Sequence, residues 1–197
     1  MKVENEITVA VTCDYETLKQ ELEKRGFSIK EEYQINDNYM IDGNIDLSDM
    51  PYLEILKKCV LVREIEGIKK ALVYKYKKYA ENGDILEQSK IECPVTDIDK
   101  AVKFMEAINY KSLFSIYDRC IVFANDTAEM IVERVNDEYL FIEMETKGDY
   151  IDRTYSSTEE LKEEIGKYSL PIDTSNYFVK KAEIMLKKTL KRKSTNN

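Results

Sequence analysis

Two glutamates stand two residues apart near the start of the chain, in the segment VENEITVAV at residues 3–11. Side chains two apart share one face of a strand, so Glu4 and Glu6 would point the same way. Adjacent carboxylates repel each other unless water, a cation or basic side chains compensate them. Glu143 and Glu145 repeat this spacing in FIEMETK. Each pair marks either a solvated face or a metal site, and the alternation of charge alone favours the solvated face.

The absence of histidine restricts the chemistry available to the chain. It excludes Ser-His-Asp and Cys-His catalysis and any histidine-ligated metal. Acid–base or metal chemistry would have to use carboxylates, lysine, tyrosine or cysteine, and carboxylates favour hard cations such as Mg²⁺ or Mn²⁺.

The cysteines do not form a recognisable site. The four of them are scattered, with no CxxC spacing. This predicts reduced thiols in a cytoplasmic protein rather than a disulfide framework or a zinc site. One adjacent base is weak evidence for activation, so we interpret Cys120, next to Arg119, as a buried thiol.

Further charged residues lie on alternate positions of other strand-like segments. They are Arg63 in VLVRE, Lys75 and Lys77 in ALVYKYKK, Lys90 and Glu92 in QSKIEC, Arg119 in YDRCIVF, and Glu133 in IVERV. A sheet with one buried and one wet face would also show this alternation.

The order of predicted elements indicates a strand-rich fold with a few helices. Helices are predicted at about 15–25, 97–109, 156–168 and 175–192, from capping residues and helical spacing of apolar side chains. Strands are predicted at 3–12, 30–42, 58–67, 69–81, 85–95, 112–125, 129–137 and 138–148, with a hairpin turn at Asn82–Gly83 and a loop region around 42–51. Many strands joined by short turns suggest a meander that closes into a barrel.

Composition limits the possible partners. The chain has 197 residues, 43% of them hydrophobic, and a net charge of −8. This content supports a real core, whereas the acidity argues against a general nucleic-acid binder. The sequence has no apolar run long enough for a membrane span, and MKVENEI has no signal-peptide pattern. From this and from the acidity, we expect neither a membrane nor a nucleic-acid partner.

The motifs, taken in order, resemble those of the CYTH superfamily, the triphosphate tunnel metalloenzymes. The matching segments are ENEIT (4–8), QINDNYM (34–40), VLVRE (60–64), ALVYKY (71–76), KIE (90–92), YDRC (117–120), VERV (132–135), FIEME (141–145) and SNY (175–177). The resemblance implies an α+β fold: an antiparallel eight-stranded β-barrel, the triphosphate tunnel, with helices packed outside. The resemblance covers roughly residues 3–180. We expect a single domain at 1–190, including C-terminal helices at about 157–190, and a disordered tail at 191–197.

The same resemblance implies a site and an activity. Carboxylates would hold Mg²⁺ or Mn²⁺, and bases would grip a small-molecule triphosphate such as tripolyphosphate, a nucleoside triphosphate or thiamine triphosphate, which would be hydrolysed. The implied catalytic metal ligands are Glu4, Glu6, Glu143 and Glu145. The implied substrate contacts and tunnel acids are Arg63, Lys75, Lys77, Lys90, Glu92, Arg119 and Glu133.

Three positions depart from the family's pattern. Thr8, Leu61 and Tyr117 stand where that pattern has a base. Each lost charge-assisted contact is worth about 1.5–3 kcal/mol. Lys2, Lys69 or Lys77 could compensate. Two alternatives therefore stay open: a degenerate domain that binds a phosphorylated ligand or a protein partner, and a class IV-type adenylate cyclase. The sequence is also compatible with a homodimer.

Overall fold

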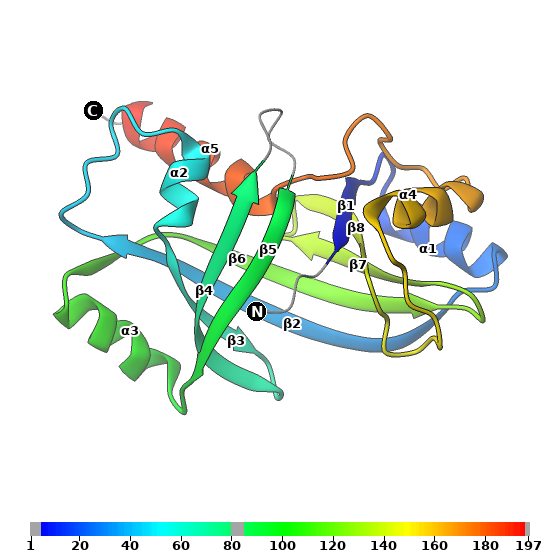
Figure 1. Cartoon of the computed structure of the whole chain (residues 1–197), viewed down its shortest axis with the longest axis horizontal. Helices are drawn as coiled ribbons and strands as arrows, with labels where there is room; N and C mark the ends of the chain where they lie inside the picture. Colours follow the sequence, from blue (N-terminus) through cyan, green and yellow to red (C-terminus); the bar gives the residue numbers. More distant parts are fainter. Residues whose placement is uncertain (1–4, 80–84, 196–197) are drawn as a thin grey trace.

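The computed structural model describes residues 5–79 and 85–195, and these residues contain eight strands and five helices (Figure 1). The strands are β1 (Glu6–Ala10), β2 (Ser28–Asp42), β3 (Val60–Ile65), β4 (Lys69–Tyr79), β5 (Ile85–Pro94), β6 (Tyr110–Ala124), β7 (Glu129–Val135) and β8 (Tyr139–Glu145). The helices are α1 (Tyr15–Lys24), α2 (Tyr52–Lys57), α3 (Ile98–Ala107), α4 (Thr158–Lys167) and α5 (Lys181–Thr195).

The strands form one antiparallel sheet in the order β1-β8-β7-β6-β2-β3-β4-β5. The first strand of the chain thus pairs with the last, as the predicted barrel requires. No ladder joins β1 to β5 within the described residues, so the sheet is curved and antiparallel as predicted but not strictly closed. The long strands β2 and β6 run across most of the molecule and pair along their whole length (Figure 1).

One face of the sheet packs against three helices, and we call it the α1 face. At one end, Ile7, Ile121, Val132 and Ile142 join a buried cluster with Leu18 and Leu22 of α1 and Leu161 and Ile165 of α4. At the other end, Met40 and Val62 pack on Ala101 and Met105 of α3. Figure 1 shows α1 and α4 together at one end of the sheet and α3 at the other.

The opposite face, the α5 face, combines apolar and charged side chains. Its apolar part packs Leu61, Val73 and Phe141 against Met185 and Leu186 of α5, with Ile55 of α2 in the same cluster. The apolar side chains of the C-terminal helix therefore pack on the sheet.

The approach of α5 is fixed by the segment just before it. This segment pairs with the free edge of β1: the amide of Thr8 donates to the carbonyl of Tyr177, and the amide of Val179 donates to the carbonyl of Thr8, both at 3.0 Å. The pairing covers a sheet edge and delivers the first turn of α5 to the α5 face.

Local sequence explains several boundaries. Asp14 caps α1 by accepting from the amide of Thr17, and Gly26 follows the helix with a positive φ of 81°, as expected for a helix end. Asn136 and Asp137, with φ of 52° and 54°, make the tight turn that joins β7 to β8. This hairpin fixes Glu133 and Glu143 on neighbouring strands.

Some elements differ from the sequence predictions. The short helix α2 directly follows a segment expected as loop and was not predicted, and α5 begins at Lys181 rather than near residue 175. The predicted turn at Asn82–Gly83 lies outside the described residues. All four cysteines are free, and Cys120 is buried, as predicted. None of the helices in the described ranges has the length and apolarity needed to cross a membrane.

Candidate functional site

The pairing of the first strand with the last brings three glutamates together on the α5 face. In the β1–β8 ladder, Glu6 stands opposite Glu145 and Thr8 opposite Glu143. One carboxylate oxygen from each of Glu6, Glu143 and Glu145 lies within 4.8 Å of the others. Two of these side chains are half-buried and Glu145 is exposed, so the group is open to an incoming cation.

Lys181, the first residue of α5, extends its ammonium group into the acids. Its Nζ lies 3.4 Å from Glu143 Oε2, 3.4 Å from Asp118 Oδ2 and in contact with Glu133 Oε1. The hydroxyl of Thr8 also donates to Glu143 Oε2, at 3.4 Å. Thr8 has no positive charge to place beside Glu143. Lys181, from the last helix, places its ammonium group there instead.

Three carboxyl groups share this single ammonium. Burial and the nearby Glu143 raise the pKa of Glu133 well above its usual value, against the opposing effect of Lys181. Burial also raises the pKa of Asp118. For Lys181, burial acts to lower the pKa, but the charges of Glu133, Glu143 and Asp118 outweigh it and raise the pKa. If all three carboxyl groups are ionised, their negative charges therefore exceed the single positive charge of Lys181.

The basic side of the same face begins at Arg63. Its guanidinium makes two hydrogen bonds to Asp37, Nε to Oδ1 at 2.6 Å and Nη2 to Oδ2 at 2.5 Å. The two residues stand opposite each other on β3 and β2, and both side chains are largely buried. Burial acts to lower the pKa of Arg63, but the hydrogen bonds and charge of Asp37 outweigh it and raise the pKa. The guanidinium is oriented by a fork-shaped contact of the kind that also binds phosphate.

Three lysines extend the basic side across β4 and β5. Lys69 donates to both oxygens of Glu92, at 3.0 and 2.8 Å. Lys75 and Lys90 stand opposite each other in the β4–β5 ladder, and Glu92 stands opposite Val73 on the same face. Lys77 lies on β4, but its side chain is outside what the structure describes.

Arg119 does not lie with these residues. It stands opposite Arg134 in the β6–β7 ladder, and the next residues of the same parity, Ile121 and Phe123, are buried in the α1-face cluster. Asp118 and Cys120 instead point to the α5 face, with Cys120 opposite Glu133. Arg119 lines a separate cavity of about 330 Å³ with Tyr15, Arg134 and other residues.

The remaining predicted positions divide clearly. The structure places Glu6, Glu143, Glu145, Glu133, Arg63, Lys75, Lys90 and Glu92 on one face, whereas Glu4 lies outside the described residues. Sequence reasoning missed Asp37, Asp118 and Lys181 as members of the site. Lys181 could have been found, because it lies four residues before the buried Met185 and so shares its helix face.

The acids fit a hard divalent cation. Carboxylate oxygens are the preferred ligands of Mg²⁺ and Mn²⁺. Octahedral Mg²⁺ needs neighbouring oxygens about 3 Å apart, so oxygens already within 4.8 Å of one another need only small side-chain rotations. A cavity of about 10 Å³ beside Glu143 and Glu145 has room for a water or an ion.

Comparison with known proteins identifies the fold. No family model and no curated protein sequence matches the chain. Among solved structures, a protein of Pyrococcus horikoshii OT3 is 17% identical with a TM-score of 0.61, over 92% of this chain and 99% of that one. A candidate adenylate cyclase of Vibrio parahaemolyticus is 13% identical with a TM-score of 0.60, over 94% and 98%.

A third similar structure carries a described activity. The candidate adenylyl cyclase of Hippeastrum, reported to reveal a dominant triphosphatase activity, is 12% identical with a TM-score of 0.56, over 95% of this chain and 96% of that one. At these identities the likeness shows a shared fold. The fold expected from the CYTH resemblance is therefore confirmed over nearly the whole chain.

Proposed function

We propose that this chain is a member of the CYTH superfamily that hydrolyses a linear triphosphate with a divalent metal ion. The observation that carries the proposal is the common placement of Glu6, Glu143 and Glu145 with Arg63 and Lys75 on the α5 face. Acids for a cation and bases for phosphate oxygens are the two requirements of metal-assisted phosphoryl transfer. The described activity of the Hippeastrum protein, which shares the fold, supports the same class of reaction.

Glu6, Glu143 and Glu145 would hold the ion at the acidic end. A bound Mg²⁺ or Mn²⁺ supplies Lewis-acid polarisation of a phosphoryl oxygen. The hydroxyl of Thr8 and the ammonium of Lys181, both directed at Glu143 Oε2, keep that carboxylate in place. Lys181 also brings a positive charge to the acidic end, beside carboxylates that would repel a phosphate chain.

The bases on β3, β4 and β5 would bind the rest of the triphosphate. Arg63 has a planar fork that can contact two phosphate oxygens, and Asp37 orients it. Lys75 and Lys90 face each other, and their like charges favour an anion between them. Their role is to neutralise charge as the phosphoryl group is transferred.

A second candidate function is binding without turnover. It is favoured by the pairing of bases with acids: Arg63 with Asp37, Lys69 with Glu92, and Lys181 with three carboxyl groups. It is also favoured by Asp118 and Cys120, which put an acid and a thiol on the α5 face of β6.

Cyclisation of ATP would use the same residues with the ribose hydroxyl as nucleophile. Because the chain shares its fold with the Vibrio protein, the experiment also measures this reaction.

The experiment is phosphate release from tripolyphosphate, ATP and thiamine triphosphate with Mg²⁺ or Mn²⁺, with cyclic AMP measured in parallel and a thermal melt for each ligand. We expect phosphate release that is lost in Glu6→Gln and Glu143→Gln and kept in Glu16→Gln, an exposed glutamate on α1. Ligand-dependent stabilisation without product would favour the binding function. If no ligand is turned over and none stabilises the protein, both the hydrolytic and the binding function are excluded. The free cysteines support a cytoplasmic setting, so the assays belong under reducing conditions.

A further inference from the structure

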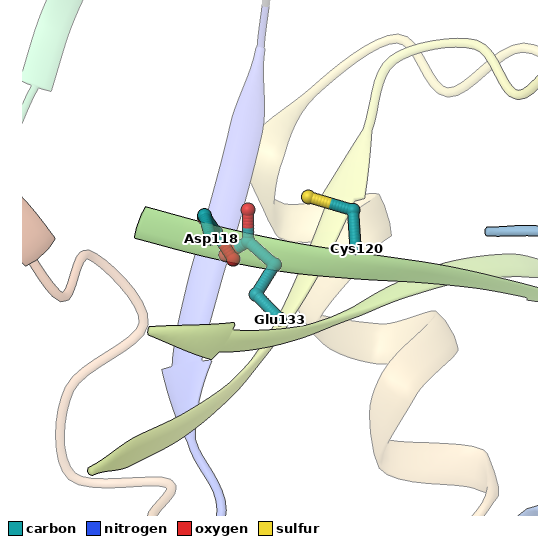
Figure 2. Close-up of side chains that lie close together, drawn as sticks. All are labelled: Asp118, Cys120 and Glu133. Carbon is teal, nitrogen blue, oxygen red and sulfur yellow. The ribbon is translucent and has the colours of Figure 1, made fainter. Parts of the chain in front are cut away.

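A second group of metal-ligating side chains lies deeper in the α5 face. Asp118 and Cys120 are two residues apart on β6, and Glu133 stands opposite Cys120 on β7. One ligand atom from each of the three lies within 4.8 Å of the others. Figure 2 shows the carboxyl groups of Asp118 and Glu133 side by side, with the sulfur of Cys120 directed toward them.

Two of the carboxyl oxygens in this group have no hydrogen-bond partner among the residues that the structure describes. Asp118 and Glu133 are each 3% exposed, and Lys181 contacts one oxygen of each. The other two oxygens, Asp118 Oδ1 and Glu133 Oε2, are buried without a hydrogen bond to any part of the chain that the structure describes. Buried polar atoms are normally satisfied, and two unsatisfied carboxyl oxygens beside a thiol are able to accept a cation.

The chemistry of the three ligands differs from that of Glu6, Glu143 and Glu145. Those are all-oxygen ligands, suited to Mg²⁺ or Mn²⁺. A thiolate added to two carboxylates shifts the preference toward ions of borderline softness, above all Zn²⁺, which takes sulfur and oxygen ligands in tetrahedral sites. Three protein ligands leave the fourth position for water.

We propose that Asp118, Cys120 and Glu133 bind a divalent transition-metal ion of the Zn²⁺ class. This site is separate from the Mg²⁺ or Mn²⁺ site at Glu6, Glu143 and Glu145. On binding, the ion replaces the proton of the Cys120 thiol, and that proton leaves to solvent. Two carboxylates and one thiolate then carry three negative charges, and the ion together with Lys181 carries three positive charges. These charges balance, apart from that of Glu143, which also contacts Lys181, and the ion ties β6 to β7 where α5 docks.

The site is tested with Co²⁺, which replaces Zn²⁺ and gives a near-ultraviolet charge-transfer absorption only when a thiolate is bound. Metal-free, reduced full-length protein is titrated with Co²⁺ alone. We expect one equivalent to produce this absorption in the wild type and in Cys59→Ser. Cys59 is an equally buried thiol that contacts the carbonyl of Ile55 rather than acids, so it is the matched control. Cys120→Ser should lose the absorption.

A second variant covers the case in which Cys120→Ser fails to fold. Glu133→Gln keeps the thiol, and it should weaken Zn²⁺ binding, measured by competition with a chromophoric chelator, on the order of 100-fold. Absence of the cobalt–thiolate absorption in the wild type, or its persistence in Cys120→Ser, would overturn the proposal. Glu6→Gln should keep the absorption even though it is expected to lose triphosphate hydrolysis, so the two proposals can fail independently.

Discussion

The ammonium of Lys181, the first residue of α5, contacts the carboxylate of Glu133 in the middle of β7. Glu133 is almost fully buried, and Lys181 is about a fifth exposed, so the contact joins the last helix to the interior of the sheet. Replacement of Lys181 by Met should therefore destabilise the protein by about 3–5 kcal/mol without divalent metal, because it leaves buried carboxyl groups without their cation. Chemical denaturation measures this loss.

Divalent metal should restore part of that stability. The acids released by Lys181→Met become better cation ligands, so the rise in melting temperature on adding Mg²⁺ or Zn²⁺ should exceed that of the wild type. Lys187→Met is the matched control, since Lys187 lies on the same helix but pairs with Glu183 at its surface. Equal destabilisation by the two substitutions would show that the Glu133 contact has no special weight.

The pairing of Arg63 with Asp37 predicts strong coupling between the two residues. Arg63→Met should cost about 3–5 kcal/mol, because Asp37 is left buried and unpaired. The double variant Asp37→Asn/Arg63→Met should cost clearly less than the sum of the single variants, since it removes both charges. Urea denaturation of the four proteins completes the cycle. Additive losses would mean that the side chains contribute separately.

The strands and the shared face of the acids were predictable from alternation. Strand side chains alternate with a fixed period of two, so Glu6 and Thr8, like Glu143 and Glu145, had to share a face once β1 paired with β8. The order of the motifs, with one E-x-E in the first strand and one in the last, indicated that pairing. The turn at Asn136 and Asp137, which joins β7 to β8, agrees with the short turns expected between strands, whereas the one hairpin turn predicted by residue lies outside the described residues.

The face of Arg119 could not be read in the same way. Both parities of β6 are apolar beyond this point, with Ile121 and Phe123 on one side and Cys120 and Val122 on the other. A strand buried on both faces gives no alternation to decide which charged neighbour points to the site.

The burial of Lys181 was missed for a different reason, because lysines on an amphipathic helix are usually exposed. The short helix α2 has no side-chain N-cap to mark its start.

Glu164 on α4 predicts a specific loss of stability in acid. Burial acts to raise the pKa of this carboxylate, but hydrogen bonds from Lys167 and Tyr168 and the charge of Arg153 outweigh it and lower the pKa. A depressed pKa in the folded state stabilises the protein above the ordinary glutamate value of about 4.3, and this contribution disappears as the pH falls through the folded value.

Two substitutions of glutamate by glutamine test the role of the ionised Glu164 carboxylate. Glu164→Gln should lower the free energy of unfolding at neutral pH by about 1–3 kcal/mol, because it removes the charge that Arg153 and Lys167 contact at 2.8 and 2.7 Å. The difference from the wild type should begin to shrink as the pH falls below about 4.3, where the unfolded chain takes up the proton first, and should vanish once the folded carboxylate is protonated as well. Glu163→Gln, an exposed neighbour, should leave the pH profile unchanged. A difference that persists undiminished at low pH would contradict the role of the ionised carboxylate.

The two faces of the sheet predict opposite outcomes for two bases. Lys75 lies on the α5 face with the acids, so Lys75→Ala should weaken triphosphate binding by about tenfold or more, the effect of one charge-assisted contact. Arg119 lies on the α1 face beside Tyr117, so Arg119→Ala should leave binding unchanged and have little effect on stability, as expected for a half-exposed charge. Calorimetric titration with tripolyphosphate and Mg²⁺ compares the variants. A large loss of affinity in Arg119→Ala, with Lys75→Ala unaffected, would move the triphosphate site to the α1 face and to the cavity that Arg119 lines.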